Sequence, residues 1–430
     1  MNIKVKGGQV ISGELTPSGS KNSAVALIPA SVMFKEKVVL TNIPEITDVT
    51  RLVAILEKLG SVVVWDKKES VLTIDNRNIS FTGLDKEDLG NMKGVSLLWG
   101  PMLARFGEVS FKDLPGGCTL GFRTLDPHYQ AFKELGVEVR ESAESVSMNA
   151  NNAKATEVWL REMSPTATEN VVTLATRISG TTRIVGAASE PQVQDLCNFL
   201  VESGASIHGI GSSVLEITGG KPLTPPASHE LLSDHYEITT FLALGALTGG
   251  EVRIKKAIPQ HMRGIVSVFN KFNVSVEYEG DAAIVHGGQQ IKIMEKEGRG
   301  TLAIKAQPWP ALPVDTLPLF IALSLKAESG QVLFHNWMYD AGLFWTSELQ
   351  KYGVNVVMCD PHRVIINAGN QLRGATIEAP YIIRAVVALV MAGMIAEGES
   401  TILNADALYR GHPHFAENLK RLGAEIEEIK

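Results

Sequence analysis

The sequence predicts an α/β fold built from six copies of one unit, divided into two domains of three units each. A helical run ends in Gly or Asn six times along the chain, and a short β-rich segment follows each time. Gly and Asn adopt the left-handed conformation that ends a helix before a returning strand. The turn residues recur roughly every 70 residues, a spacing typical of repeat architectures. They are Gly60, Gly136, Gly204, Asn273, Gly353 and Gly423.

Length and composition agree with two soluble domains. A chain of 430 residues is too long for one core, so two domains of about 200 residues each are expected. The 45% hydrophobic and 20% charged residues are typical of a soluble globular protein. The net charge of −7 disfavours nucleic-acid binding. The three cysteines form no CxxC pair, which favours neither disulfides nor a zinc site, so we expect a cytoplasmic protein.

The first elements are expected to be strands. Residues 3–5 alternate apolar and charged side chains, residues 11–15 are a second candidate strand, and residues 24–30 are expected to form a helix. The most apolar stretch, residues 385–396, is too short to cross a bilayer. We therefore expect it to be a buried helix.

A segment rich in glycine and proline, residues 219–226, separates the third unit from the fourth. Domain crossings are expected shortly after it, near Leu232, and near residues 18–20, where the opening β segment meets a helix. The first strands would then complete the C-terminal domain. The expected domains are residues 21–232 and residues 1–20 plus 233–430, with a cleft between them.

One connection, residues 112–128, differs from the short connections of the other units. Three glycines surround Cys118, and Arg123 follows. Gly-rich backbone lets amides approach an anion, and a nearby arginine would hold a phosphate and lower the pKa of the thiol. The alternative is a loop with an incidental cysteine.

Isolated charged residues provide further candidates. Lys21 precedes a helix, where its charge opposes the helix dipole unless an anion binds; the alternative is a solvated lysine. Arg384 lies in an apolar run and Arg410 in a later loop, so each is expected to be paired or to bind an anion. Asp315 follows a proline-rich turn and is either a base or a helix N-cap.

Several motifs are absent: GxxxxGK[ST], GxGxxG after a strand, HExxH and GxSxG. Nucleotide hydrolysis, Rossmann-type cofactor binding and metalloprotease chemistry are therefore disfavoured.

Seven motifs carry a resemblance to a known family: SGSKNSA, LWGPMLARFG, PGGCTLGFRTLDPH, SPTATEN, SEPQVQDLCNFL, SDHYEITTF and PWPALPVD. On these motifs, and over essentially the whole chain, the sequence resembles the enolpyruvyl transferases. The resemblance implies a two-domain inside-out α/β barrel with six β-α-β-α-β-β repeats, three per domain.

The resemblance also implies a reaction. The enolpyruvyl group of phosphoenolpyruvate would pass to the 3′-hydroxyl of UDP-N-acetylglucosamine with release of phosphate, the first committed step of peptidoglycan precursor synthesis. These two small molecules are the implied partners. No metal, organic cofactor, nucleic acid or membrane is implied, and a monomer is expected.

Roles carry over by position within the matched motifs. Lys21 and Arg123 would hold the phosphate of phosphoenolpyruvate, and Arg384 and Arg410 its carboxylate. Asn22 would contact the sugar hydroxyl or the intermediate. Cys118 would be the acid near the vinyl carbon and the target of fosfomycin, and Asp315 the base. The binding site of the UDP-sugar would be lined by Lys93, Arg123, Thr124, Leu125, Asp126, Pro127, Ser164 and Met338.

The chain departs from the family pattern at four positions. Gly342 stands where the family carries an arginine, and Ile382 where it usually has an aspartate. His412 replaces the usual aromatic after Arg410-Gly411, and Lys93 replaces a common arginine. Two alternatives therefore stay open. The chain could be a paralogue acting on a different nucleotide or sugar-nucleotide acceptor, or a weakly active homologue that binds a UDP-sugar.

Overall fold

Two compact units make up the described part of the chain. A computed structural model describes residues 1–80, 84, 93–111, 125–142, 145–294 and 300–429. Unit 1 contains Met1–Ser18 and Ser233–Lys430, and unit 2 contains the described residues from Gly19 to Leu232. Each unit has a hydrophobic core of its own.

Unit 2 has three small sheets among its described residues, with strand orders β13-β3-β5-β4, β6-β8-β7 and β11-β12-β10-β9. The strands are β3 (Val38–Thr41), β4 (Val62–Asp66), β5 (Val71–Asp75), β6 (Glu108–Phe111), β7 (Glu138–Glu141), β8 (Val146–Asn149), β9 (Glu157–Trp159), β10 (Gly180–Val185), β11 (Ser206–His208), β12 (Val214–Gly219) and β13 (His229–Glu230).

The described part of unit 1 also has three sheets, with strand orders β15-β16-β14-β2, β17-β18-β20-β19 and β21-β22-β1-β23. The strands are β1 (Asn2–Lys6), β2 (Gly13–Leu15), β14 (Val252–Ile254), β15 (Glu277–Glu279), β16 (Ala282–Val285), β17 (Leu302–Lys305), β18 (Gln331–His335), β19 (Asn355–Asp360), β20 (Arg363–Asn367), β21 (Thr376–Glu378), β22 (Glu399–Leu403) and β23 (Ile426–Ile429).

Each described sheet takes most of its strands from one sequence repeat. In five of the six sheets that the structure describes, an outer strand runs parallel to its neighbour. Parallel pairing requires a crossover connection, which usually contains a helix. Three strands near the domain crossings complete sheets elsewhere in sequence, and one of them, β2, pairs with β14. β1 lies between β22 and β23, and β13 pairs with β3.

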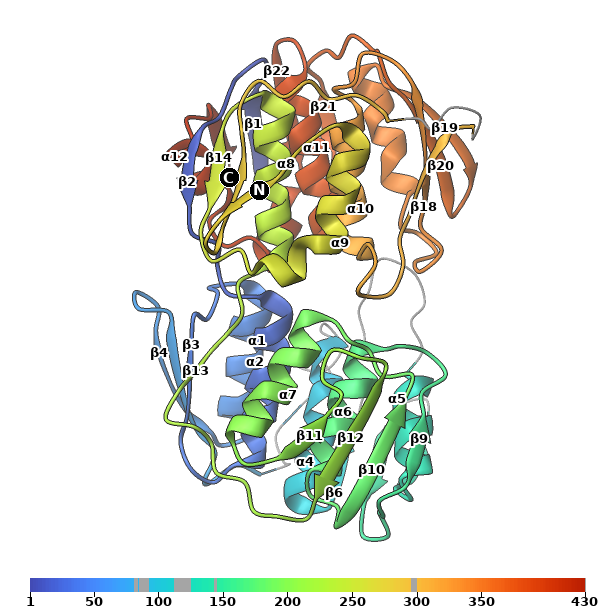
Figure 1. Cartoon of the computed structure of the whole chain (residues 1–430). Coiled ribbons are helices and arrows are strands. Elements are labelled where there is room, and N and C mark those ends of the chain that lie inside the picture. The colour runs from blue at the N-terminus through green and yellow to red at the C-terminus, as the bar shows by residue number, and fades with distance from the viewer. Residues whose placement is uncertain (81–83, 85–92, 112–124, 143–144, 295–299, 430) are drawn as a thin grey trace. The chain divides into compact units, whose positions relative to one another are not determined.

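Helices occupy the centre of each unit. In unit 1, α8 (His235–Thr248), α10 (Leu317–Ser324) and α11 (Ile383–Ile395) pack on one another, and in unit 2, α1 (Lys21–Ala30), α4 (Trp99–Phe106) and α6 (Pro165–Ala175) do so. All residues of α8 and α10 are buried, as befits a helix enclosed on all sides. Figure 1 shows α8, α10 and α11 side by side, with β18 and β20 outside them.

The remaining helices are shorter or more peripheral. They are α2 (Thr47–Lys58), α5 (Asp126–Glu134), α7 (Pro191–Glu202), α9 (Pro259–Phe269), α12 (Phe415–Arg421) and the 3-10 helices η1 (Ser31–Met33), η2 (Lys93–Leu98), η3 (Asn270–Phe272), η4 (Val314–Thr316), η5 (Phe344–Tyr352) and η6 (Ala405–Arg410).

The expected inside-out α/β arrangement is confirmed, with helices in the centre and sheets outside. The described sheets are open, so none of them closes into a β-barrel. The apolar stretch expected to be a buried helix is α11. In the described ranges, no helix is both long enough and apolar enough to cross a membrane.

The six predicted turn residues all adopt positive φ, between 59° at Asn273 and 101° at Gly60 and Gly204. This is the left-handed region that Gly and Asn tolerate best. The helix-ending turn that the sequence predicts is therefore confirmed in all six repeats.

Candidate functional site

The N-terminus of α1 carries the first two candidate residues, Lys21 and Asn22. Ser20 caps this helix, because its side chain accepts a hydrogen bond from the backbone N–H of Ser23 at 3.2 Å. The backbone N–H of Ser20 donates to the carbonyl of Leu232 at 2.6 Å. The start of α1 is thus fixed to the segment that ends unit 2.

Lys21 is an ion-paired residue. Its Nζ lies 2.9 Å from Oδ2 of Asp48 on α2, and its side chain is 19% exposed. The alternative of a solvated lysine is therefore wrong. The sequence offered no signal for this pair, since Asp48 lies on a different helix and resembles an ordinary first-turn acid.

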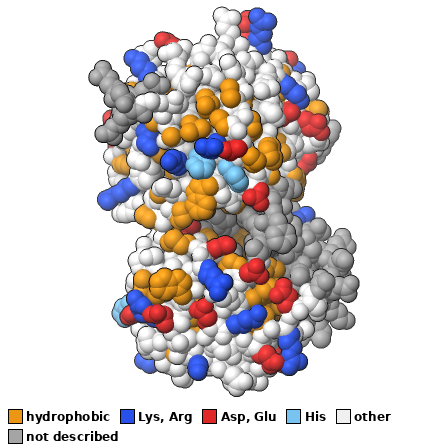
Figure 2. Space-filling model, turned by 90° about the vertical axis from the view of Figure 1, so that its right-hand side faces the viewer, with side chains coloured by type: hydrophobic (Ala, Val, Ile, Leu, Met, Phe, Trp, Pro, Cys, Tyr) orange, Lys and Arg blue, Asp and Glu red, His pale blue; other side chains and the backbone are white. Residues whose placement is uncertain are grey.

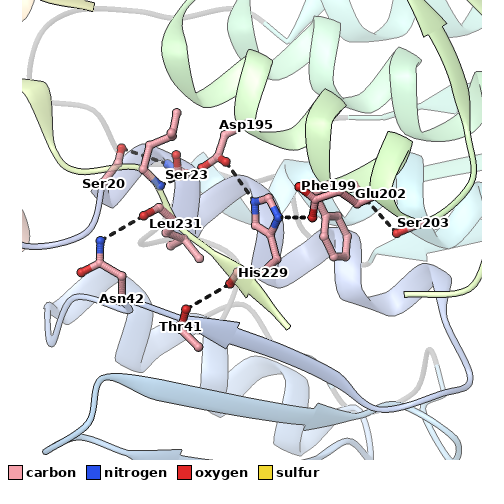
Figure 3. A network of polar contacts seen from close by, with 11 residues as sticks. Ser20, Ser23, Thr41, Asn42, Asp195, Phe199, Glu202, Ser203, His229 and Leu231 are labelled. Atoms are coloured by element: carbon pink, nitrogen blue, oxygen red, sulfur yellow. Dashed lines mark hydrogen bonds and ion pairs between the residues drawn. The ribbon is translucent and has the colours of Figure 1, made fainter. Parts of the chain in front are cut away.

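A polar network centred on the buried His229 holds the segment that anchors Ser20 (Figure 3). His229 on β13 contacts Asp195 Oδ1 at 3.0 Å through Nε2 and Glu202 Oε2 at 2.8 Å through Nδ1, both on α7. Asp195 Oδ2 also accepts from the backbone N–H of Leu232 at 3.2 Å. Burial lowers the pKa of His229, but hydrogen bonds with the two carboxylates outweigh it and raise the pKa above 6.5.

Two further helix N-termini in unit 2 carry candidates for the sugar-nucleotide site. Asp126 and Pro127 begin α5, preceded by Leu125. Ser164 caps α6, where its side chain accepts from the N–H of Ala167 at 3.3 Å. Because helix N-termini carry partial positive charge, this placement suits anionic phosphate groups.

The N-termini of α5 and α6 are joined by hydrogen bonds. His128 contacts Thr166 at 3.1 Å through Nε2 and Asn170 at 3.0 Å through Nδ1. The amide of Asn170 also donates to the carbonyl of Ser96 in η2 at 3.0 Å. The 3-10 helix η2 and the starts of α5 and α6 are therefore held together by the buried amide of Asn170 and the buried imidazole of His128.

Four candidate residues fall outside what the structure describes. Cys118, Arg123 and Thr124 lie outside the described residues, and so does the side chain of Lys93, whose backbone begins η2.

In unit 1, Arg384 lies at the start of α11 and is 6% exposed. Its guanidinium donates to Nε2 of His412. It lies over the ring of Tyr236 at 5.0 Å and 4.0 Å from Oδ1 of Asp234. Arg384 is thus held by both neutral and acidic groups.

Arg410 ends η6, next to α11. Its guanidinium lies over the ring of Tyr381 at 5.3 Å. The following Gly411 packs closely on Ile383, since a Cβ there would lie 3.2 Å from the Ile383 side chain. The backbones that carry Arg384 and Arg410 are therefore adjacent in unit 1.

Asp315 lies in η4, immediately before α10. No side-chain capping bond is made at the start of η4 or α10, so the alternative of a helix N-cap is wrong. The partly buried Met338 lies in the loop after β18.

Gly342, where the family pattern implies an arginine, packs closely against the side chain of Asn336. A Cβ at this position would lie 2.2 Å from Nδ2 of the buried Asn336. A side chain at position 342 would therefore require the side chain of Asn336 to move.

Sequence reasoning missed several buried acids. Burial and the neighbouring Glu190 raise the pKa of Glu169 well above its ordinary value, and burial raises the pKa of Glu190 to about 7. Burial also raises the pKa of Glu237 in α8 to about 7. The only available signal was their position within quoted motifs. Across the described ranges, no cluster of His, Cys, Asp and Glu could hold a metal ion.

On the face drawn in Figure 2, acidic and basic side chains are interspersed on both units.

Known proteins match the chain over nearly its full length. The family model of EPSP synthase (3-phosphoshikimate 1-carboxyvinyltransferase) matches residues 5–427. The UDP-N-acetylglucosamine 1-carboxyvinyltransferase of Borrelia garinii subsp. bavariensis is 37% identical over 426 residues, covering 99% of this chain and 98% of the relative. The enzyme of the same name from Bradyrhizobium diazoefficiens is 38% identical over 425 residues, covering 99% and 97%.

Solved structures share the fold. The enolpyruvyl transferase NikO from Streptomyces tendae aligns with a TM-score of 0.84 at 21% identity, covering 99% of this chain and 98% of that one. An EPSP synthase from Acinetobacter baumannii aligns with a TM-score of 0.73 at 17% identity, covering 99% of each chain. Together with the full-length family match, this places the chain in the EPSP synthase family of carboxyvinyltransferases.

Proposed function

We propose that this chain transfers the enolpyruvyl group of phosphoenolpyruvate to the 3′-hydroxyl of UDP-N-acetylglucosamine and releases phosphate. The observation that carries the proposal is the 37–38% identity, over 99% of this chain, to relatives named for this activity. The reaction would serve peptidoglycan precursor synthesis in the cytoplasm.

Phosphoenolpyruvate carries a phosphate and a carboxylate, and each needs cationic partners. We assign the phosphate to Lys21 and Arg123, and the carboxylate to Arg384 and Arg410. Charge-assisted hydrogen bonds from positioned cations are the strongest polar contacts available for this purpose. The Lys21–Asp48 pair places the ammonium at the start of α1, where the helix N-terminus favours an anion.

The uridine nucleotide is assigned to the helix N-termini of unit 2. Asp126, Pro127 and Ser164 mark two of them, and Lys93, Arg123, Thr124 and Leu125 belong to the same assignment. Met338 is assigned to the same ligand.

The chemistry needs an acid and a base. The 3′-hydroxyl oxygen attacks C2 of phosphoenolpyruvate while a proton is delivered to C3, and loss of phosphate and a C3 proton then restores the double bond. General acid–base groups serve both proton transfers. We assign the acid to Cys118 and the base to Asp315, whose side chain caps no helix. Asn22 would hold the sugar hydroxyl or the intermediate.

The test is release of phosphate from phosphoenolpyruvate, measured with and without UDP-N-acetylglucosamine. The proposal expects release that depends on this sugar nucleotide and yields one enolpyruvyl ether per phosphate. Release that depends instead on another acceptor would identify a paralogue. Binding of the UDP-sugar with no release would identify a weakly active homologue.

A further inference from the structure

Arg384 is a buried arginine whose positive charge has no closely paired carboxylate among the described residues. An arginine side chain stays protonated in proteins and offers five N–H donors, and this one is buried. A buried charge is costly unless it is paired and hydrogen-bonded. Among the described residues, the nearest acid is Asp234, whose Oδ1 atom lies 4.0 Å away.

That Asp234 oxygen is already engaged in capping α8. It accepts hydrogen bonds from the backbone N–H groups of Tyr236 at 2.8 Å and Glu237 at 3.0 Å. Burial raises the pKa of Glu237 to about 7, which leaves this second acid substantially protonated near neutral pH. Neither acid forms a close bidentate pair with Arg384.

The direct partner of Arg384 is instead the imidazole of His412. Its Nε2 accepts from Nη1 of the arginine, and its ring is fully buried against Phe415. Burial and the adjacent guanidinium hold the pKa of His412 well below its ordinary value. The imidazole is therefore neutral, with its acceptor nitrogen aimed at the arginine.

A neutral acceptor orients a guanidinium without cancelling its charge, whereas a carboxylate at the same place would do both. We propose that His412 is a positioning residue, which fixes the guanidinium of Arg384 and leaves its positive charge available to the carboxylate of phosphoenolpyruvate. This inference rests on the proposed function for the identity of the anion.

Three substitutions separate orientation from packing. His412→Phe keeps an aromatic ring against Phe415 but removes the acceptor, and His412→Gln supplies a neutral amide acceptor. His414→Phe is the matched control, because His414 lies two residues further on, is half exposed and contacts Glu417. Each protein is assayed for the KM of phosphoenolpyruvate at saturating UDP-N-acetylglucosamine, for kcat, and for thermal stability.

The expected result is a KM for phosphoenolpyruvate about tenfold higher in His412→Phe, the size associated with a hydrogen bond to a charged group. His412→Gln should stay within about threefold of the wild type, and His414→Phe should match it. In a chain that already carries Arg384→Lys, His412→Phe should raise the KM for phosphoenolpyruvate little further. The effects of two residues are not additive when one acts through the other.

The proposal is overturned if His412→Phe loses thermal stability but keeps the wild-type KM, or if its effect adds fully to that of Arg384→Lys. Calorimetric titration of the same proteins with phosphoenolpyruvate, in the presence of UDP-N-acetylglucosamine, measures the affinity for phosphoenolpyruvate independently of catalytic activity. A wild type that binds phosphoenolpyruvate but releases no phosphate would therefore contradict the proposed function and still decide the role of His412.

Discussion

At the scale of single residues, the chain shows how burial decides which charged groups are available for chemistry. Lys21 and Arg384 were both singled out from the sequence as cations in unexpected places. Their partners, Asp48 and His412, could not be identified there, because both lie on other elements and one is uncharged. The sequence therefore predicts which residues need a partner, and only the fold supplies the partner.

Asp315→Asn is expected to lower kcat by about 100-fold or more, which is the usual size of a general-base contribution. The amide keeps the shape of the side chain and removes the proton acceptor. Since Asp315 caps no helix, the melting temperature should hardly change. The exposed Asp340 provides the control substitution, Asp340→Asn. A variant with normal kcat would remove Asp315 from the reaction.

Fosfomycin is expected to alkylate Cys118 alone. Two other thiols provide internal controls, because Cys197 is buried and Cys359 is exposed. Burial, together with the nearby Glu169, raises the pKa of Cys197 to about 12, which keeps it as an unreactive thiol. Peptide mass spectrometry after treatment in the presence of UDP-N-acetylglucosamine locates the adduct. An adduct on Cys359 would mean that exposure, and not activation, decides reactivity.

At the scale of elements, the sequence predicts the repeated unit. It does not predict which distant strands complete the sheets. The six turns and the buried helix α11 follow from local rules on Gly, Asn and apolar periodicity. The place of β13 beside β3 depends on a pairing across almost 190 residues. Local patterns carry no information on such a pairing, and the contact between β13 and α7 was likewise missed.

The contact of β13 with α7 should make stability depend on pH. The pKa of His229 is raised above 6.5 in the folded chain, so its stabilising effect is complete below that pH and is lost as the pH rises through the folded value. The groups that face it are Asp195, Glu202 and the ring of Phe199.

His229→Gln should therefore lower the melting temperature by roughly 4–8 °C at pH 6, for a loss of about 2 kcal/mol in a domain of this size. The difference from the wild type should shrink as the pH is raised towards 9. His208→Gln, on an exposed strand position, is the control. The measurement is thermal unfolding of both proteins across this pH range. A difference in melting temperature that stays the same from pH 6 to about pH 9 would contradict the prediction.

At the scale of the whole molecule, each unit is expected to fold as an independent body if it has all its strands. Unit 2 has its own core, and its described residues all lie between Gly19 and Leu232. Unit 1 is discontinuous, because β1 lies between β22 and β23 and buries Ile3 and Val5 in the core. Without β1, two strand edges are exposed and a cavity replaces two apolar side chains.

Residues 19–232 expressed alone should therefore unfold in one cooperative thermal transition, whereas residues 233–430 alone should not. Joining residues 1–18 to the C-terminal end of 233–430 through a flexible linker should restore cooperative unfolding, because β1 and β2 return to their sheets. Circular dichroism and amide hydrogen exchange measure both properties. A fragment 233–430 that unfolds cooperatively without the first 18 residues would show that β1 is dispensable to the core of unit 1.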